Sequence, residues 1–195
     1  MKLLEERILR DGVVKEGNIL KVDSFLNHQI DPVINGAMAD EFVRLFIDSG
    51  ANKIMTIEAS GIALAAAVAS RMNLPLVFAK KIRTKNIADD VYRAKVLSYT
   101  TGNTYEIIVS KSFVLPGDKI LIIDDFLARG QAVLGLLDII KQAGAKAVGC
   151  GIAIEKGFQE GGKLLRSRGI DLHSLAVIEE MDEKHIVFRP QPDQR

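Results

Sequence analysis

The chain has 195 residues, the usual size of one α/β domain and enough to bury a substantial core. Its 26 Lys and Arg residues nearly balance its 25 Asp and Glu residues, so composition gives no indication of a surface for nucleic acid. No apolar run is long enough to span a membrane, and the first residues lack the apolar segment of a signal peptide. We therefore expect a single cytoplasmic domain over residues 1–195.

Apolar periodicity predicts alternating helices and strands along the chain. The clearest helix start is at Asp31 and Pro32, with the aspartate as N-cap and the proline in the first turn. Helices are predicted at residues 3–10, 32–48, 60–72 and 131–142, with a short one after residue 162. Strands are predicted at residues 19–22, 53–57, 75–79, 120–123, 147–154, 172–178 and 185–188, with a hairpin at 92–100 and 104–110.

This alternation indicates an α/β fold with a mainly parallel central sheet flanked by helices. The hairpin at residues 92–110 would be an antiparallel flap outside the alternation, and residues 190–195 are predicted to be disordered. Cys150, the one cysteine, cannot form an internal disulfide. Because it lies in an apolar strand, we expect it to be a buried core thiol and not a nucleophile.

The most informative segment is the strand at residues 120–123, which runs directly into Asp124 and Asp125. A loop of mostly small residues follows at 128–132, and then a helix begins. The strand carries both acids to the carboxyl edge of the sheet, where open α/β folds bind ligands. Backbone N–H groups at the start of the helix provide an anion site. Acids for hydroxyl groups beside amides for a phosphate indicate a sugar-phosphate pocket, although apolar strands ending in two aspartates also occur in other α/β proteins.

The segment resembles the signature with which type I phosphoribosyltransferases bind 5-phosphoribosyl 1-pyrophosphate (PRPP). The resemblance implies that Asp124 and Asp125 are the catalytic pair that holds the ribose hydroxyls. It implies that the 5′-phosphate binds the loop of Ala128, Arg129, Gly130, Gln131 and Ala132. Residues with hydroxyl side chains are commoner at three of these loop positions. The departure leaves backbone amides, and the Arg129 side chain, to contact the phosphate.

Two further segments resemble parts of the same site. The strand-to-helix junction of Glu58, Ala59, Ser60 and Gly61 resembles the family's pyrophosphate loop, although Ser60 could also be a plain N-cap. The pair Lys80 and Lys81 stands where family members place basic residues for pyrophosphate, although a solvated surface pair would look the same. Residues 83–99 correspond to the family's flexible flap, whose closure would exclude water from the activated sugar.

The likeness extends from residue 12 to residue 188 and is greatest to bacterial family members that use xanthine. It implies a small hood over the base, formed by residues 1–30 and 155–190, with base contacts from Leu20, Phe25, Asn27, Lys156 and Phe158. Lys156 and Asn27 offer donors to the carbonyl oxygens of an oxopurine, and adenine would leave those donors unpaired. Alone, Lys156 would more often be a surface charge and Phe158 a core residue.

The resemblance implies an enzyme of pentosyl transfer in purine salvage, which converts xanthine and PRPP to xanthosine 5′-monophosphate and pyrophosphate. Mg²⁺ would bind mainly through PRPP and pyrophosphate, and the three histidines lack the spacing of protein metal ligands. The family implies a homodimer, with Lys81 reaching the neighbouring subunit, and no nucleic-acid or membrane partner. Two alternatives stay open: an adenine or hypoxanthine/guanine phosphoribosyltransferase, and a PRPP-sensing regulator, which would need a DNA-binding module or a basic face.

Overall fold

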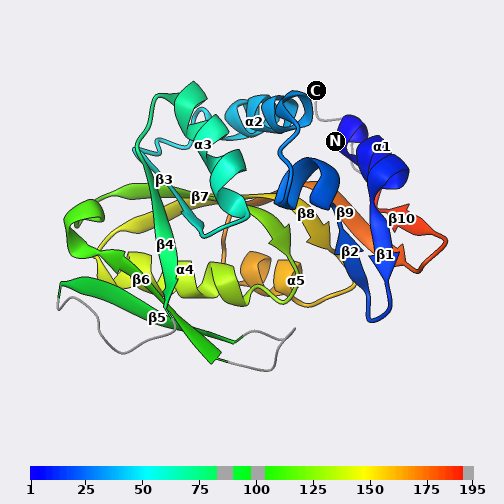
Figure 1. Ribbon diagram of the computed structural model, residues 1–195. Helices are drawn as coiled ribbons and strands as arrows, with labels where there is room; N and C mark the ends of the chain where they lie inside the picture. The colour runs from blue at the N-terminus through cyan, green and yellow to red at the C-terminus, as the bar shows by residue number, and fades with distance from the viewer. Residues whose placement is uncertain (83–89, 98–103, 191–195) are drawn as a thin grey trace.

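The computed structural model describes residues 1–82, 90–97 and 104–190, and its centre is one large β-sheet (Figure 1). The strands of this sheet are β3 (Lys53–Ile57), β4 (Leu76–Ile82), β5 (Val91–Leu97), β6 (Thr104–Ser110), β7 (Lys119–Leu127), β8 (Lys146–Lys156), β9 (Leu172–Met181) and β10 (Ile186–Phe188). Their order across the sheet is β10-β9-β8-β7-β3-β4-β6-β5. The five strands from β9 to β4 are parallel, as predicted, and the outer strands are antiparallel.

The chain changes direction across the sheet between β3 and β7. From β3 it continues outward to the neighbouring β4, and it then returns to the other side of β3 to form β7, β8 and β9 in turn. In open parallel sheets, this reversal leaves a crevice at the carboxyl ends of the two strands, where ligands bind. The predicted aspartates lie near the carboxyl end of β7, the predicted phosphate loop follows that strand, and the predicted pyrophosphate loop follows β3. The topology therefore brings all three to this crevice.

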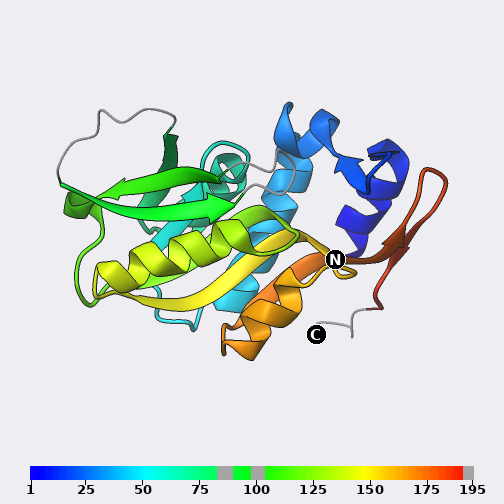
Figure 2. The same ribbon diagram turned by 90° about the horizontal axis from the view of Figure 1, so that it is seen from below.

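Helices cover both faces of the sheet (Figures 1 and 2). They are α1 (Lys2–Asp11), α2 (Pro32–Phe46), α3 (Gly61–Met72), α4 (Gln131–Gln142) and α5 (Gly161–Ser167). Alternate residues of β7 enter two separate cores: Leu121 and Ile123 pack with α2 and α3, whereas Ile120 and Ile122 pack with α4. A strand buried on both faces has to be apolar at every position, which explains its unbroken apolar run.

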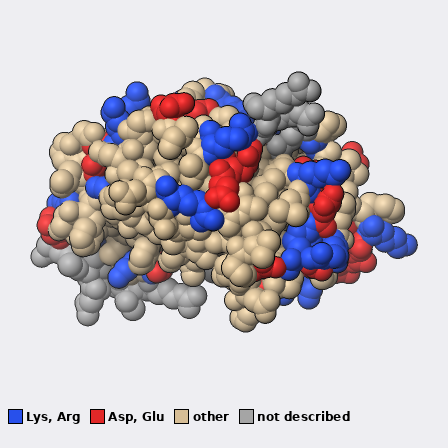
Figure 3. Space-filling view, turned by 90° about the horizontal axis from the view of Figure 1, so that it is seen from above, with Lys and Arg blue, Asp and Glu red and all other residues tan. Residues whose placement is uncertain are grey.

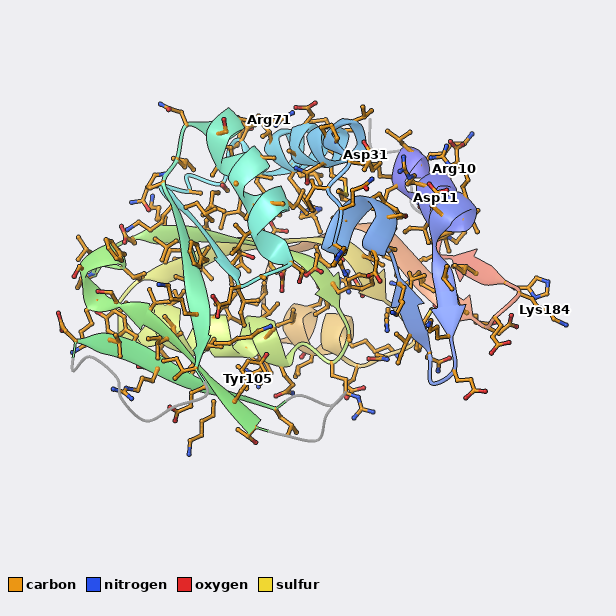
Figure 4. All side chains as sticks on the ribbon, viewed as in Figure 1. Arg10, Asp11, Asp31, Arg71, Tyr105 and Lys184 are labelled. Atoms are coloured by element: carbon orange, nitrogen blue, oxygen red, sulfur yellow. The ribbon has the colours of Figure 1, made fainter. Side chains whose placement is uncertain are left out.

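The predicted start of α2 is confirmed. The Asp31 carboxylate accepts hydrogen bonds from the N–H groups of Val33 at 2.9 Å and Ile34 at 3.4 Å, and Pro32 is the first helical residue. Arg7 of α1 also contacts Asp31, at 2.8 Å, so the cap joins the two helices. Asp31 lies near the end of α1, where Arg10 and Asp11 are labelled in Figure 4.

One end of the molecule is built from both termini of the chain (Figure 1). A small antiparallel sheet of β1 (Val13–Lys15) and β2 (Ile19–Lys21) lies there beside α1, β9 and β10. A π-helical turn, Asp23–Asn27, connects β2 to the segment before α2. The sequence predicted α1, β2 and β10, but it missed β1 and the π-helical turn, which are too short to show a period.

The hairpin of β5 and β6 corrects the prediction of a separate flap. Its antiparallel pairing is confirmed, but β6 also pairs with β4, so the hairpin continues the main sheet. Ala94 and Val96 of β5 are buried in the same core as α4. Residues 83–89 and 98–103 of the predicted flap, including the predicted turn, lie outside the described residues, as do residues 191–195 of the predicted disordered tail.

Two further features agree with the composition. No helix within the described residues is long and apolar enough to cross a membrane. Basic and acidic side chains are interspersed over the face that α2 and α3 cover, seen from above in Figure 3. Cys150 is completely buried, as predicted, and burial raises the pKa of its thiol far above the ordinary value.

Candidate functional site

The two aspartates lie at the carboxyl end of β7, where the topology places the crevice. Asp124 is 3% exposed and Asp125 is 6% exposed, which is rare for carboxylates. The N–H of Asp125 donates to the Asp124 carboxylate at 3.1 Å. Burial raises the pKa of Asp124 well above its usual value, and the neighbouring charge of Asp125 adds to the effect, while Lys81 acts in the opposite direction. Asp124 is therefore held in an environment that favours a proton or a bound ligand.

The pyrophosphate-loop segment packs directly against Asp124. A side chain at Gly61 would collide with the Thr56 hydroxyl and would come within 2.5 Å of Asp124 Oδ1. Glycine at the start of α3 thus lets the helix approach β7 closely. Glu58 accepts a hydrogen bond from the N–H of Lys81 at 2.6 Å, which joins the ends of β3 and β4. Ser60 makes no side-chain capping bond to α3, so the simple N-cap alternative has no support within the described residues.

The predicted phosphate loop is a turn between β7 and α4. Gly130 has φ +78°, a left-handed conformation that strains residues with a side chain, and α4 begins at the next residue. The N–H groups of the first helical turn have no partners within an α-helix and attract anions. Arg129 lies 3.7 Å from Glu160 at the start of α5, so its guanidinium stays beside the loop.

A cavity of about 500 Å³ opens at this loop. Residues 128–132 line one side, and Gly17, Asn18 and Ile19 of the β1–β2 hairpin line another together with Lys156. Tyr105 also lines it, from β6, and is labelled in Figure 4. Burial and then the charge of Asp124 raise the pKa of the Tyr105 hydroxyl, which places this ring within reach of the aspartate's field. The cavity thus brings the predicted phosphate loop and the Lys156 ammonium to one space.

The structure separates the two lysines that the sequence grouped together. Adjacent residues of a strand point to opposite faces of a sheet. The Lys81 ammonium lies 5.5 Å from the centre of the Tyr105 ring, on the site side, and its charge acts on Asp124. Lys80 instead lines a different, mainly apolar hollow of about 550 Å³ beside Phe78 and Phe113. Only Lys81 is brought to the candidate site in this chain.

Of the five residues predicted to contact the base, only Lys156 is among the described residues that line the cavity. Its ammonium donates to the carbonyl oxygen of Asn18 at 2.8 Å, and burial lowers its pKa. Asn27 is exposed, and Phe158 is 38% exposed. Leu20 is buried, and Phe25 is completely buried in the core under the Arg7 guanidinium. Phe25 therefore has no exposed surface with which to contact a base, and its predicted role is corrected to that of a core residue.

The sequence reasoning missed the hairpin tip and the two glycines at the start of α5. Gly17 and Asn18 have positive φ angles of 79° and 59°, the pattern of a tight hairpin turn, and that signal was visible in the sequence. A side chain at Gly161 would lie 2.7 Å from the Gly130 nitrogen and 2.9 Å from the Arg129 carbonyl carbon. Gly161 thus allows α5 to pack against the phosphate loop, and only the folded structure reveals this contact.

Residues 22–193 match the family described as the phosphoribosyl transferase domain, which covers most of the chain. The chain belongs to this family. The family and the enzyme class that the loop motif predicted are thereby confirmed.

Curated relatives align with this phosphoribosyltransferase over nearly its whole length. One is named xanthine phosphoribosyltransferase, from Lachnoclostridium phytofermentans, and is 51% identical over 97% of this chain and 98% of its own. Another, from Clostridium botulinum, is named xanthine phosphoribosyltransferase 2 and is 52% identical over 97% of this chain and 100% of its own.

Solved structures confirm the type I phosphoribosyltransferase fold. Adenine phosphoribosyltransferase from Giardia lamblia, complexed with 9-deazaadenine, superposes with a TM-score of 0.76 at 20% identity, over 91% of this chain and 98% of its own. The adenine phosphoribosyltransferase of Thermoanaerobacter pseudethanolicus gives a TM-score of 0.72 at 22% identity, over 89% of this chain and 98% of its own. At such identities the likeness supports the fold alone.

Proposed function

We propose that this phosphoribosyltransferase joins xanthine to PRPP, forming xanthosine 5′-monophosphate and pyrophosphate, as a step of purine salvage in the cytoplasm. The observation that carries the proposal is the cavity in which the phosphate loop and Lys156 face one space. The loop offers an anion site, and Lys156 offers a hydrogen-bond donor for a base carbonyl. The names of relatives that share about half of the residues favour xanthine over the other purines.

In this reaction, the bond from the sugar to pyrophosphate breaks as the base nitrogen bonds to the same carbon atom. Positive charge develops on the sugar as pyrophosphate leaves. Asp124 and Asp125 would hold the ribose hydroxyls, and their negative field would stabilise that charge. The loop amides at residues 128–132 would hold the 5′-phosphate, so both substrates are placed in line. Hydrogen bonds from the sugar to the Asp124 carboxylate would offset part of the free-energy cost of burying it. They would replace the hydrogen bonds to water that the carboxylate loses on folding.

Magnesium would enter this site with PRPP. Within the described residues, no group of three or more His, Cys, Asp or Glu side chains is arranged to hold a metal ion. Two adjacent carboxylates, Asp124 and Asp125, would suit an ion that enters with the substrate. Mg²⁺ would neutralise charge on the pyrophosphate, while the protein would contribute the aspartates and Lys81.

For the base, we propose that Lys156 of the hood is the main contact. The Lys156 ammonium would exchange the carbonyl oxygen of Asn18 for a carbonyl oxygen of xanthine, both of which are good acceptors. An adenine amino group would leave this ammonium unpaired in a partly buried place, which is costly. Asn27 and Phe158 remain predicted contacts from the rim, where their side chains are exposed.

We further propose that the chain is one domain that functions as a homodimer. The apolar hollow lined by Phe78, Phe113 and neighbouring residues of β4 and β6 supports this assembly, because Phe113 is 60% exposed and Phe78 is 37% exposed. Light scattering should then give twice the mass of one chain, and the mass of one chain would contradict this part of the proposal.

The decisive experiment measures turnover with PRPP and each purine base in turn, with and without Mg²⁺. We expect xanthosine 5′-monophosphate to form faster than the other nucleotides, and only with Mg²⁺. Preferred use of adenine, guanine or hypoxanthine would instead identify another purine phosphoribosyltransferase. No turnover with any base, together with a gel shift of DNA that PRPP alters, would indicate the regulator.

A control within the site uses Asp125→Asn. This change keeps the size of the side chain but removes the negative charge near the reacting sugar. Turnover should fall by about a hundredfold or more, as it does when one stabilising group is removed from an enzyme transition state. The circular dichroism spectrum should stay the same. Unchanged turnover would show that Asp125 does not stabilise the sugar.

A further inference from the structure

An ion pair between a buried carboxylate and a partly exposed guanidinium lies between β8 and α5, next to the phosphate loop, and none of the roles above uses it. Glu155, which is 2% exposed, accepts two parallel hydrogen bonds from Arg166, each 2.9 Å long. The Ser174 hydroxyl of β9 donates to the same carboxylate at 2.6 Å. Burial raises the pKa of Glu155, but the bonds from Arg166 and Ser174 outweigh it and the net shift is downward. The carboxylate is thus charged and bonded from two neighbouring elements.

This pair fixes α5 at its start as well as at its end. A side chain at Gly162 would collide with the Glu155 carboxylate and would lie 2.6 Å from the Arg166 guanidinium. The first turn of α5 therefore packs on the ion pair with no space between them. Because Arg166 comes from the last turn of the same helix, the pair determines both where α5 lies and how it is rotated.

The start of α5 in turn contacts the phosphate loop through backbone atoms. The N–H of Gly161 donates to the carbonyl oxygen of Ala128 at 3.1 Å. A Cβ atom added to Gly161 would be within 3 Å of the backbone of Arg129 and Gly130. Backbone packed against backbone does not adapt by turning a side chain, so a shift of α5 moves the loop.

The pairing of β8 with β7 also places Glu155 beside the start of the phosphate loop. In the pairing of β7 with β8, Glu155 lies opposite Leu127, the last residue before the loop. The sheet thus holds the residue just before the loop, α5 holds the loop from Ala128 onward, and Glu155 contacts both supports. Because the Arg166 side chain is 41% exposed, the ion pair is weak evidence for stability. Its position indicates a role in geometry instead.

We propose that Glu155 and Arg166 are positioning residues that set the phosphate loop in the geometry that binds the 5′-phosphate of PRPP. The inference rests on the proposed function. The pair contacts no substrate, and it acts through α5 and Gly161. A change in the pair should therefore alter the binding of a phosphate monoester at residues 128–132. It should not alter the binding of the pyrophosphate group, which the β3 and β4 side of the site would bind.

The test uses Arg166→Lys, which keeps the charge but loses the planar fork that forms two parallel bonds. Calorimetry would measure the affinity of the protein for PRPP, ribose 5-phosphate and pyrophosphate, each with Mg²⁺. We expect binding of PRPP and of ribose 5-phosphate to weaken together by about tenfold, because a loop displaced by a fraction of an ångström loses hydrogen bonds. Pyrophosphate binding should change less than about twofold.

Arg44→Lys is the matched control. Arg44 forms the same kind of fork with Glu41, at 2.9 and 2.7 Å, but on α2, which covers the opposite face of the sheet. All three affinities should stay as in the parent protein. Gly161→Ala keeps both Glu155 and Arg166 but changes the contact between α5 and the loop, and it should reproduce the selective loss, so the test does not depend on Arg166→Lys folding.

The outcomes separate the two proposals. Equal weakening of all three ligands, or a lower melting temperature with unchanged ribose 5-phosphate affinity, would overturn the positioning role alone. A parent protein that does not bind PRPP would overturn the proposed function and this inference with it.

Discussion

At the scale of single residues, Asp124 is where burial and ligand binding conflict most directly. Its carboxylate is 3% exposed and lies beside a second carboxylate, so the free protein ionises it at a cost in folding free energy. A ligand hydroxyl relieves part of that cost, which makes the residue useful in the complex and unfavourable without it. Such a residue is typical of functional sites, where shifted pKa values gather.

We therefore predict that Asp124→Asn stabilises the free protein at neutral pH. Because the folded-state pKa of this acid is raised, the folded protein holds its proton above the ordinary aspartate pKa of about 3.9, and stability falls as the pH rises from there toward the raised pKa. Each kcal/mol that the substitution adds to the free energy of unfolding would raise the melting temperature by about 2–4 °C.

Melting curves of both proteins from pH 4 to pH 8 test this prediction. The difference in melting temperature between the two proteins should be small at pH 4 and should grow as the pH rises. The Asp124→Asn protein should also have lost its turnover. A destabilised Asp124→Asn protein at pH 8 would mean that the ionised carboxylate is well solvated or well paired in the free protein.

Lys156 carries a second prediction at this scale. Lys156→Ala removes the ammonium that faces the cavity but leaves the phosphate loop in place. The KM for xanthine should rise by about tenfold or more, as expected for a lost charged hydrogen bond, and the affinity for PRPP should change little. Lys146→Ala, at the exposed start of the same strand, is the control. An equal loss of both ligands would show that Lys156 is structural.

At the scale of elements, the local periodicity was sufficient to predict the helices and the parallel strands. It did not predict which distant strands pair, because that pairing leaves no mark on a strand's own sequence. The hairpin of β5 and β6 was thus predicted as a separate flap, although β6 pairs with β4. Strand alternation would have separated Lys80 from Lys81, but the two were read as a basic pair. The contact of Gly161 with the loop depends on tertiary packing and could not be read from either segment.

The glycines of β8 show how an element is fitted to its neighbour. A Cβ atom at Gly151 would lie 2.7 Å from the Phe42 ring of α2 and 2.8 Å from Ile123. We predict that Gly151→Ala destabilises the protein by about 1–3 kcal/mol, because the closely packed core has to shift. Thermal unfolding would measure the loss.

Gly36→Ala is the matched control, since it makes the same change inside α2, near only the flexible end of Arg71. That change should stabilise the helix by about 0.5–1 kcal/mol. A neutral Gly151→Ala variant would mean that the α2 aromatic rings can move aside freely.

At the scale of the whole molecule, the reversal of chain order between β3 and β7 explains why the site could be found from one short motif. The fold brings the carboxyl ends of both strands together, so the junction after β3 lies at the same edge of the sheet as the motif. The sequence indicated that junction only through its resemblance to the family's pyrophosphate loop, because the pairing of β3 with β7 cannot be read from either segment. The burial of the predicted base contacts could not be foreseen, because they lie in irregular segments whose burial, as at Phe25, depends on the completed core.

Binding of PRPP at a site formed by several strands should stabilise the entire fold. With PRPP and Mg²⁺ at a hundred times the dissociation constant, the free energy of unfolding should rise by about 2.7 kcal/mol. For a chain of this size, that corresponds to about 5–10 °C in melting temperature. Differential scanning fluorimetry would measure the shift, with Asp125→Asn as the variant in which it should shrink. A melting temperature that PRPP leaves unchanged would contradict binding at this site.

The hydrogen bond from Lys156 to Asn18 has a consequence for engineering. It joins the β1–β2 hairpin to the base end of the cavity, whereas the groups proposed for the sugar all follow residue 57. The hairpin at residues 13–21 thus lies outside the stretch that carries the groups proposed for the sugar. We expect that grafting a different hairpin at residues 13–21 would redirect the enzyme toward modified bases while its sugar chemistry stays as it was.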